Sequence, residues 1–392
     1  MLVWNDFRHD ARVRKEADTL QADGHAVTVH ALHTPGQTRK RECLPSGVRV
    51  SRVARSPFSR LERKGGTPAP AGRLRLLWRA ATRTTAHLSW LARVVAGRPD
   101  VVHAHDVNTL PTAWLAARLS RAKLVYDAHE ISTDREGYKS LRGLVGWIEK
   151  RLIARADATI TTTDARAAFF ARAYGVPRPL VLQNRPRLEL PTPSNRLREE
   201  LALRPDLPIV LYQGGLQQGR GLERLVVAAR DLPGAYFVFI GSGRLSGRLH
   251  EMVREFRLED RVRFVPTVEL DRLPSYTRSA DIGVQPIENT CFNHFTTDSN
   301  KLFEYVCAGL PVVATAMPEI RRIVREHDCG VLVPPGDTAA LKAALQHLVG
   351  DAAARTAYGR NAVKAAQALN WEAQEDRLVA LYRRLTERSV PK

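Results

Sequence analysis

The chain has 392 residues, of which 44% are hydrophobic and 26% are charged. This balance is typical of a globular protein and excludes an intrinsically disordered chain, and the length predicts two domains rather than one core. A formal net charge of +19 is shared with nucleic-acid-binding proteins, so charge alone does not identify the function.

Strands and helices alternate along the first half of the sequence. A short strand at residues 2–4 is followed by a polar loop and by a helix expected over residues 11–21. Further apolar runs predict strands at residues 26–31, 48–53, 101–104, 124–126, 158–162 and 180–183. Because this alternation is typical of parallel sheets with crossover helices, residues 1–186 are predicted to form a doubly wound, Rossmann-like domain.

A second domain of the same kind is expected after a linker at residues 187–208, where several prolines oppose regular structure. Its strands are predicted at residues 209–212, 236–240, 262–265, 282–285, 311–314 and 330–333. They place the second doubly wound domain at residues 209–370, followed by a C-terminal helix in residues 371–392. The predicted fold class is therefore α/β, with two Rossmann-like domains whose strand ends face a central cleft.

Polar residues directly follow three apolar runs of the first domain, where doubly wound folds bind ligands. They are Asp10 and Arg12 after the first strand, His105 and Asp106 after the strand at 101–104, and His129 and Glu130 after the strand at 124–126. A simpler interpretation stays open for the first pair, in which Asp10 caps a helix and Arg12 is solvated. Histidines and carboxylates in this pattern could ligate a metal, but we expect none.

Glycine-rich loops follow the first two strands of the second domain. Gly214 and Gly215 would let the backbone approach a phosphate, and Arg220 in the same loop could bind phosphate oxygens with both arms of its guanidinium. Gly241 and Gly243 form a Gly-x-Gly turn after the next strand. The third glycine of a dinucleotide fingerprint is out of register, so the turn is interpreted as part of a donor site rather than as an NAD site.

The segment SNKLFEYVCAGLPVVAT at residues 299–315 predicts a short amphipathic helix that leads into a buried strand. The backbone amides of Ser299, Asn300 and Lys301 at the helix start could hold a diphosphate, with help from the helix dipole. Glu304, one turn later, could accept hydrogen bonds from sugar hydroxyls. The alternative for Glu304 is a solvated helix residue without a ligand.

The run from Asn300 to Tyr305 resembles the donor motif of one branch of the retaining family-4 glycosyltransferases, which have the GT-B fold. The resemblance implies that Glu304 binds the ribose of a nucleotide and that the backbone at residues 299–301 meets its diphosphate. It also implies that His129 lies against the transferred sugar, while Glu130 beside it positions hydroxyls. A terminal helix that returns to the first domain is a further feature of that family.

Two departures from the family pattern accompany the resemblance. The commoner motif has an earlier glutamate at the position of Thr296, and its loop has an arginine at the position of Gly215. Arg220 occupies the position of the family's lysine, so one cation is expected to do the work of two. Both departures leave open whether activity is reduced or altered.

The implied reaction is transfer of a sugar, with retention, from a nucleotide-diphosphate sugar to a hydroxyl of a glycan, glycolipid or small molecule. We expect no cofactor and no metal, since Arg220 and helix amides could stabilise the leaving diphosphate. An epimerase or phosphorylase on the same fold stays open. A basic nucleic-acid-binding protein is less favoured, because few aromatic residues interleave with the basic ones. The sequence does not indicate the donor base, the sugar, the acceptor or the oligomeric state.

Residues 55–98 form a dense basic segment with an apolar side, which favours contact with an anionic membrane surface and a lipid-linked acceptor. A solvated helix packed on the sheet is the alternative. The absence of an apparent leader, of a 20-residue apolar run and of paired cysteines predicts a cytoplasmic protein, either free or peripheral on the inner face of the cell membrane.

Overall fold

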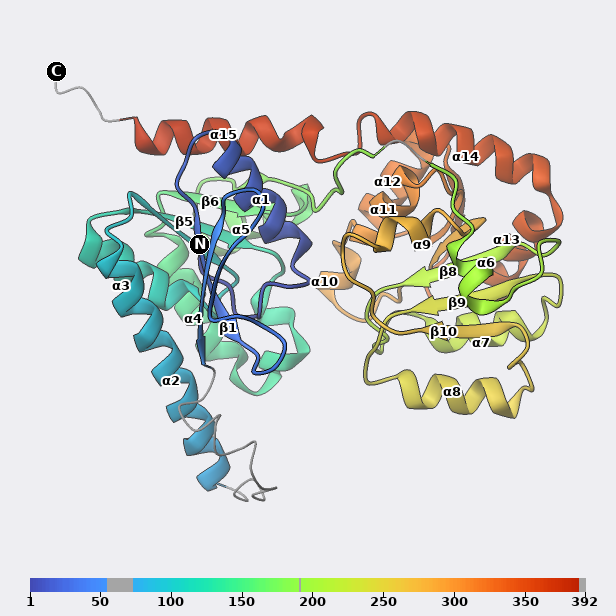
Figure 1. Ribbon diagram of the computed structural model, residues 1–392, viewed down its shortest axis with the longest axis horizontal. Helices are drawn as coiled ribbons and strands as arrows, with labels where there is room; N and C mark the ends of the chain where they lie inside the picture. The colour runs from blue at the N-terminus through green and yellow to red at the C-terminus, as the bar shows by residue number, and fades with distance from the viewer. Residues whose placement is uncertain (55–72, 190–191, 388–392) are drawn as a thin grey trace. The chain divides into compact units, whose positions relative to one another are not determined.

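The computed structural model describes residues 1–54, 73–189 and 192–387 (Figure 1). The chain divides into two compact units: unit 1 comprises Met1–Leu182 with Glu375–Lys392, and unit 2 comprises Gln183–Gln374. Residues 55–72 of the expected basic segment lie outside the described residues. No helix in the described part of the chain is long and apolar enough to cross a membrane.

Unit 1 contains two groups of strands, and the first residues of the chain join them. Leu2 bridges His30 on one side and Ala104 on the other, so the predicted strand at residues 2–4 is only an isolated bridge. The strands lie in the orders β1-β3-β2 and β4-β5-β6-β7. Their bounds are β1 (Thr28–His33), β2 (Arg41–Cys43), β3 (Arg49–Ala54), β4 (Val101–His105), β5 (Lys123–Ala128), β6 (Ala158–Thr161) and β7 (Leu180–Val181).

All ladders of unit 1 are parallel except that between β2 and β3. The sequence analysis did not predict β2, because its three residues, Arg-Glu-Cys, carry no apolar pattern. The helices are α1 (Ala11–Ala22), α2 (Arg73–Ala96), α3 (Leu110–Ser120), α4 (Arg142–Ile153), α5 (Asp164–Tyr174) and α15 (Glu372–Thr386), with short 3₁₀ helices at Ser132–Asp134 and Glu136–Leu141.

The last helix is tied to unit 1 by buried polar contacts. The hydroxyl of Tyr382 on α15 lies 2.8 Å from Nδ1 of His103 on β4, and Thr19 on α1 donates to Glu375 at 2.6 Å. Leu378 and Tyr382 are buried. The expected helical spacing of apolar residues near the C-terminus therefore corresponds to a helix that packs on the first domain's sheet and α1.

Unit 2 has one six-stranded parallel sheet in the order β10-β9-β8-β11-β12-β13. The strands are β8 (Ile209–Gln213), β9 (Tyr236–Ile240), β10 (Val262–Val265), β11 (Ile282–Gln285), β12 (Val312–Thr315) and β13 (Gly330–Val333). The chain runs outward from β8 in both directions, which places a topological switch point between β8 and β11. Ligands of doubly wound folds bind beyond the carboxyl ends of the strands at such a point.

Both faces of this sheet are covered. Ile209 and Leu211 of β8 belong to one buried cluster and Val210 and Tyr212 to the other, which explains why the strand reads as a continuous apolar run. The helices are α6 (Arg196–Leu201), α7 (Leu222–Arg230), α8 (Ser246–Glu255), α9 (Leu273–Thr277), α10 (Phe292–Phe295), α11 (Asn300–Cys307), α12 (Pro318–His327), α13 (Thr338–Gly350) and α14 (Ala352–Ala366).

Two of the differences from the sequence prediction have identifiable reasons. The helix α6 lies inside the segment at 187–208 that was expected to lack regular structure, because the stretch RLREEL between its prolines is itself helix-forming. The strand β12 begins at Val312 rather than at Pro311, since proline has no N–H to donate to the ladder.

Candidate functional site

The polar residues predicted in unit 1 converge at the carboxyl ends of β4 and β5, which are neighbouring parallel strands. His105 ends β4 and is buried, and its Nδ1 lies 3.3 Å from Nε2 of His129. Nε2 of His129 also lies 3.1 Å from a carboxylate oxygen of Asp127 on β5, and His105 Nδ1 lies 3.3 Å from the same oxygen. Asp127 is fully buried, so it is the centre of this group.

Arg12 reaches the same carboxylate from α1. Its Nε and Nη2 donate to the two oxygens of Asp127 at 2.7 and 2.9 Å, and its Nη1 donates to the carbonyl of Leu182 at 2.7 Å. Arg12 is only 3% exposed, so the interpretation of a solvated arginine is wrong. Asp10 does cap α1, because its carboxylate accepts from the amide of Val13 at 3.1 Å.

Burial and neighbouring charges shift the pKa values of these residues in different directions. Burial alone would raise the pKa of Asp127, but Arg12 and His129 hold it well below its usual range. Burial alone would lower the pKa of His129, but Asp127 and Asp106 raise it to about 9. Burial lowers the pKa of His105, which is therefore the neutral member of the histidine pair. At neutral pH the unit presents one imidazolium, His129, between two carboxylates.

Asp106 and Glu130 are joined by an arginine that the sequence analysis did not select. Arg135 pairs with Asp106 at 3.1 Å and with Glu130 at 3.0 Å. The Asp106 carboxylate also lies 3.9 Å from Nδ1 of His129. Asp106 adopts a left-handed backbone with φ of 62°, which turns the chain sharply after β4. His105, Asp106, His129 and Glu130 thus form one network, as their positions after neighbouring strands predicted.

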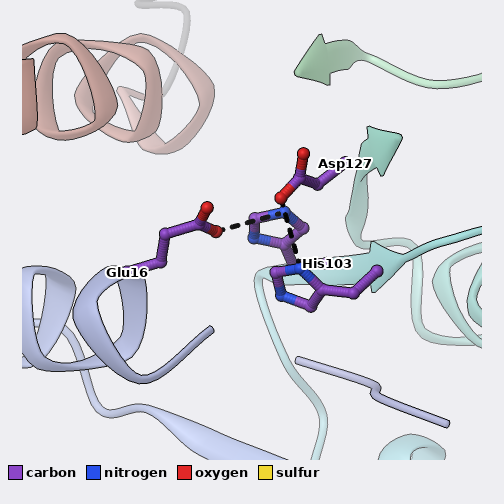
Figure 2. Close-up of side chains that lie close together, drawn as sticks. Glu16, His103 and Asp127 are labelled. Carbon is purple, nitrogen blue, oxygen red and sulfur yellow. Dashed lines mark ion pairs between the residues drawn. The ribbon is translucent and has the colours of Figure 1, made fainter. Parts of the chain in front are cut away.

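A deeper part of this network has the residue types of a metal site. Figure 2 shows the side chains of Glu16, His103 and Asp127 pointing toward one another, and with His105 they bring ligand-type atoms within 4.8 Å of each other. The positive charge of Arg12 already lies beside these groups, since its Nε is 3.1 Å from Glu16 and 2.7 Å from Asp127. A guanidinium between the two carboxylates does not favour a divalent cation beside it. The expectation of no metal stays a prediction.

The predicted glycines of unit 2 pack two loops against each other beyond β8 and β9. Gly214 and Gly241 have φ of 117° and 137°, and a Cβ on Gly241 would lie 2.2 Å from the carbonyl oxygen of Gly214. A Cβ on Gly243 would lie 2.1 Å from the carbonyl oxygen of Leu216. Gly215 is exposed, and its carbonyl accepts from the hydroxyl of Tyr212 at 3.0 Å. The glycines are therefore needed for backbone contact between the loops.

A lysine from α11 lies over the first of these loops. A Cβ on Gly214 would be 2.7 Å from Cε of Lys301, and the Lys301 ammonium lies 5.4 Å from the ring centre of Tyr212. Burial and the positive charge of Arg220 together lower the pKa of Lys301 to about 8, although Glu304 opposes both. Lys301 and Arg220 therefore lie near each other at this edge of the sheet, and the expectation that Arg220 does the work of two cations stays a prediction.

The start of α11 offers fewer amides than expected. Ser299 has φ of 47°, and its amide donates to the hydroxyl of Thr297 at 3.1 Å. The amides left for a ligand at this end of the helix are those of Asn300 and Lys301. Thr296, at the position of the family's first glutamate, is buried, and its hydroxyl donates to the carbonyl of Phe292 at 2.8 Å.

Glu304 is fixed by the end of β8. Its carboxylate accepts from Nε2 of Gln213 at 2.5 Å, and Oε1 of Gln213 accepts from the hydroxyl of Thr277 at 2.8 Å. The amide of Gln213 donates to the Tyr305 hydroxyl at 3.1 Å. Gln213 is buried and aims Glu304, so the reading of Glu304 as a helix residue in free solvent does not hold.

The functional side chains that the sequence analysis missed are those inside the regular elements. The strands predicted at residues 124–126 and 209–212 ended before Asp127 and Gln213, and neither residue was selected for the site. Both prove to lie at the ends of buried strands, where a polar residue is itself a signal. Arg135 lies in a loop with no motif around it, and no signal in the sequence pointed to it.

Two family models match successive parts of the chain. Residues 10–185 match the glycosyl transferase 4-like domain, and residues 193–365 match the glycosyl transferases group 1. Among curated relatives, the D-inositol 3-phosphate glycosyltransferase of Xylanimonas cellulosilytica is 28% identical over 365 residues, covering 87% of this chain and 83% of the relative. The enzyme of that name from Kineococcus radiotolerans is 27% identical over 404 residues, covering 95% and 89%.

Solved structures show the same architecture. Sucrose-phosphate synthase from Thermosynechococcus elongatus has a TM-score of 0.77 and 25% identity, covering 95% of this chain and 92% of that one. Anabaena HepE in complex with UDP-glucose has a TM-score of 0.74 and 17% identity, and 98% of each chain is covered. With two Rossmann-like units and matches to both domain models, the chain is a glycosyltransferase with the GT-B fold.

Proposed function

We propose that the protein transfers a sugar, with retention, from a nucleotide-diphosphate sugar to an acceptor hydroxyl, and that unit 2 binds the donor. The single observation that carries this proposal is the unbalanced positive charge at the switch-point edge of unit 2. Among the described residues, no carboxylate lies within ion-pair distance of either Lys301 or Arg220. An anionic ligand is what such a pair of cations recognises.

The donor's diphosphate would lie between Lys301 and Arg220, with the free amides of Asn300 and Lys301 as further donors. Because Gly214 has no side chain, the Lys301 stem can lie directly against this loop. Glu304, held by Gln213, would accept hydrogen bonds from the ribose hydroxyls. This arrangement stabilises the charge that develops on the leaving diphosphate without a metal or another cofactor.

Unit 1 is proposed to hold the acceptor and to contact the transferred sugar. Its partly exposed members, His129 and Glu130, would position hydroxyls, and Asp10, Arg12, His105 and Asp106 are proposed as further residues of the acceptor site. Their charges are balanced internally, which suits a neutral polyol better than a phosphate. No side chain is assigned as a nucleophile, so the departing phosphate is proposed to assist deprotonation of the acceptor.

The names of similar proteins support the donor class. The curated relatives are glycosyltransferases that act on inositol 3-phosphate by name, and the HepE structure holds UDP-glucose. We therefore propose a uridine-diphosphate sugar as the first donor to test. A cytoplasmic location is proposed with it, on the basis of the sequence alone.

The test is a thermal-shift and calorimetric titration with UDP, UDP-glucose, GDP-mannose and uridine. A ligand of the native state raises the melting temperature, so the correct donor is identified by the largest shift. Glu304→Ala is expected to abolish that shift, whereas Glu259→Ala, an exposed carboxylate elsewhere in unit 2, leaves it unchanged. Lys301→Met is expected to weaken UDP binding while uridine binding stays as it was.

Several results would contradict the proposal. An undiminished shift in Glu304→Ala, or equal losses for UDP and uridine in Lys301→Met, would remove those residues from the site. Loss of donor binding after chelation with EDTA would overturn the metal-independent assignment. Release of an epimerised nucleotide sugar, or consumption of inorganic phosphate in place of transfer, would show an epimerase or a phosphorylase instead.

A further inference from the structure

Exposed large apolar side chains are concentrated on one part of unit 1. Nine are exposed among the described residues, and six of them lie on or next to three successive helices, α2, α3 and α4. They are Leu88 of α2, Leu115 and Leu119 of α3, and Leu141, Leu144 and Trp147 at the start of α4 and along it. Single exposed leucines are ordinary, but a cluster of this size marks an interaction surface.

The three helices cover the same face of the unit 1 sheet. The helix α2 leads from β3 to β4, α3 leads from β4 to β5, and α4 leads from β5 to β6, and each step moves the same way along the sheet. Right-handed crossovers in one direction place their helices on one face. In agreement, α2 packs on α3 and α3 packs on α4 (Figure 1). The sides that face away from the sheet therefore form one surface, called here the α2–α3–α4 face.

The exposed residues follow helical spacing on each element. Leu115 and Leu119 are four residues apart, and Leu144 and Trp147 are three apart, so each pair points to one side of its helix. Trp147 is 59% exposed and Leu119 58% exposed, values far from those of a packed core. Nothing among the described residues covers them.

The same face is positively charged. Glu149 is the only acid in the sequence of the three helices, and it is buried against the hydroxyls of Tyr126, Ser132 and Tyr174. Arg118, Lys150 and Arg151 are exposed there. The guanidinium of Arg151 lies 5.5 Å from the ring centre of Trp147, which pairs an aromatic side chain with a cation at one place. Aromatic rings, apolar tips and cations without acids are the composition that anionic lipid headgroups attract.

We propose that the α2–α3–α4 face docks on an anionic lipid bilayer, with Leu144 and Trp147 entering the interface and Arg118, Lys150 and Arg151 contacting lipid phosphates. The surface shares α2 with the basic segment at residues 55–98 that the sequence suggested, and it extends beyond that segment onto α3 and α4. It does not depend on the donor chemistry of unit 2. If it holds, the acceptor hydroxyl is expected on a molecule that resides at the membrane.

The experiment is co-sedimentation of the full chain with vesicles of phosphatidylcholine alone or with about 30% phosphatidylglycerol, at low and at physiological salt. We expect binding to the anionic vesicles that weakens as salt is raised. The double variant Leu144→Ser, Trp147→Ser is expected to lose at least about tenfold in affinity for these vesicles. Arg118→Glu combined with Arg151→Glu should lose at least about 25-fold, because each cation near a charged surface contributes about fivefold and the new carboxylates are repelled by it.

Matched controls come from unit 2. Phe292 and Phe295 are also exposed aromatic residues, and Arg254 is an exposed arginine on α8, so Phe292→Ser, Phe295→Ser and Arg254→Glu should leave vesicle binding unchanged. Quenching of tryptophan fluorescence by brominated lipid should disappear when Trp147 is replaced by phenylalanine. Circular dichroism and thermal melting establish that each variant is folded.

The outcomes are distinct. Failure of the wild-type chain to bind anionic vesicles, or equal losses in the unit 1 variants and in the unit 2 controls, would overturn the proposal. A dimer in sedimentation velocity that Leu144→Ser, Trp147→Ser dissociates, without vesicle binding, would assign the face to a second copy. Binding to a single-stranded oligonucleotide that the unit 1 variants lose, without any binding to vesicles, would assign the face to nucleic acid. Donor-induced thermal shifts, measured on the same samples, report on unit 2 separately.

Discussion

Replacing Asp127 by asparagine is expected to lower the pKa of His129 by more than one pH unit. In the native protein the His129 imidazole faces Asp127 at 3.1 Å and Asp106 at 3.9 Å, and its pKa is about 9 against an ordinary value of 6.5. Asparagine keeps the shape of the side chain and removes the nearer negative charge. Asp106 remains, but burial, which lowers the pKa most strongly, and Arg12 both oppose it, so the pKa should fall to the ordinary value of 6.5 or below it.

The raised pKa of His129 also contributes to the free energy of unfolding. The difference between 6.5 and about 9 corresponds to about 3 kcal/mol favouring the protonated, folded form, at ~1.4 kcal/mol per pH unit. Because the folded-state pKa is raised, this contribution is complete below pH 6.5 and is lost as the pH rises through about 9. The free energy of unfolding should therefore fall between these two pH values in the native protein, and much less in Asp127→Asn.

The assay is a long-range proton–nitrogen correlation spectrum of the histidine rings from pH 5 to 10, with His129→Gln used to assign the signal. Urea unfolding at pH 6.5 and at pH 9 gives the matching stability change. A wild-type His129 that titrates near 6.5, or a titration unaffected by Asp127→Asn, would refute the electrostatic account. Because the measurement needs no substrate, it stands apart from the proposed reaction.

Two further changes test the packing around the candidate sites. Gly241→Ala should destabilise unit 2 by at least about 2 kcal/mol in urea unfolding, since the new Cβ would lie 2.2 Å from a carbonyl oxygen and Gly241 has φ of 137°. Gly247→Ala is the control, because nothing lies within 4 Å of the new Cβ, and it should be neutral or stabilising. Equal effects of the two substitutions on stability would contradict this reasoning. Tyr382→Phe should cost about 1–3 kcal/mol, because it leaves the buried Nδ1 of His103 unpaired, and a stability equal to that of Tyr358→Phe would count against the contact.

The fold could be predicted because parallel strands that are buried on both faces have continuous apolar sequences. The strands at residues 236–240, 262–265, 282–285 and 330–333 have the predicted bounds, since each is covered on both faces and flanked by glycine, proline or charged residues. The edge strand β2 lacks that signature because one of its sides has no neighbour and its residues are polar. Leu2 also gave no sign that it bridges two strands rather than forming one.

The candidate site was predictable only where position along the chain determines position in space. His105 and His129 follow strands that prove to be neighbours, so their proximity could be expected from the alternating pattern alone. Arg12 could not be placed, because its burial depends on Asp127, which is 115 residues away in the sequence. Lys301 shows the same limit: its amide was assigned from the motif, but the course of its long side chain over Gly214 depends on a separate loop.

Charge balance explains why similar residues in the two units suit different ligands. In unit 1 Arg135 pairs with Asp106 and Glu130, and Arg12 pairs with Asp127 beside Glu16, whose pKa burial raises to about 8. Both cations therefore fix the shape of the site. In unit 2 burial and the positive charge of Arg220 lower the pKa of Lys301. A diphosphate bound beside Lys301, as proposed above, would raise the pKa of the lysine through its negative charge. Binding of the diphosphate is therefore expected to take up a proton above about pH 8, and a neutral hydroxyl acceptor has no comparable effect in unit 1.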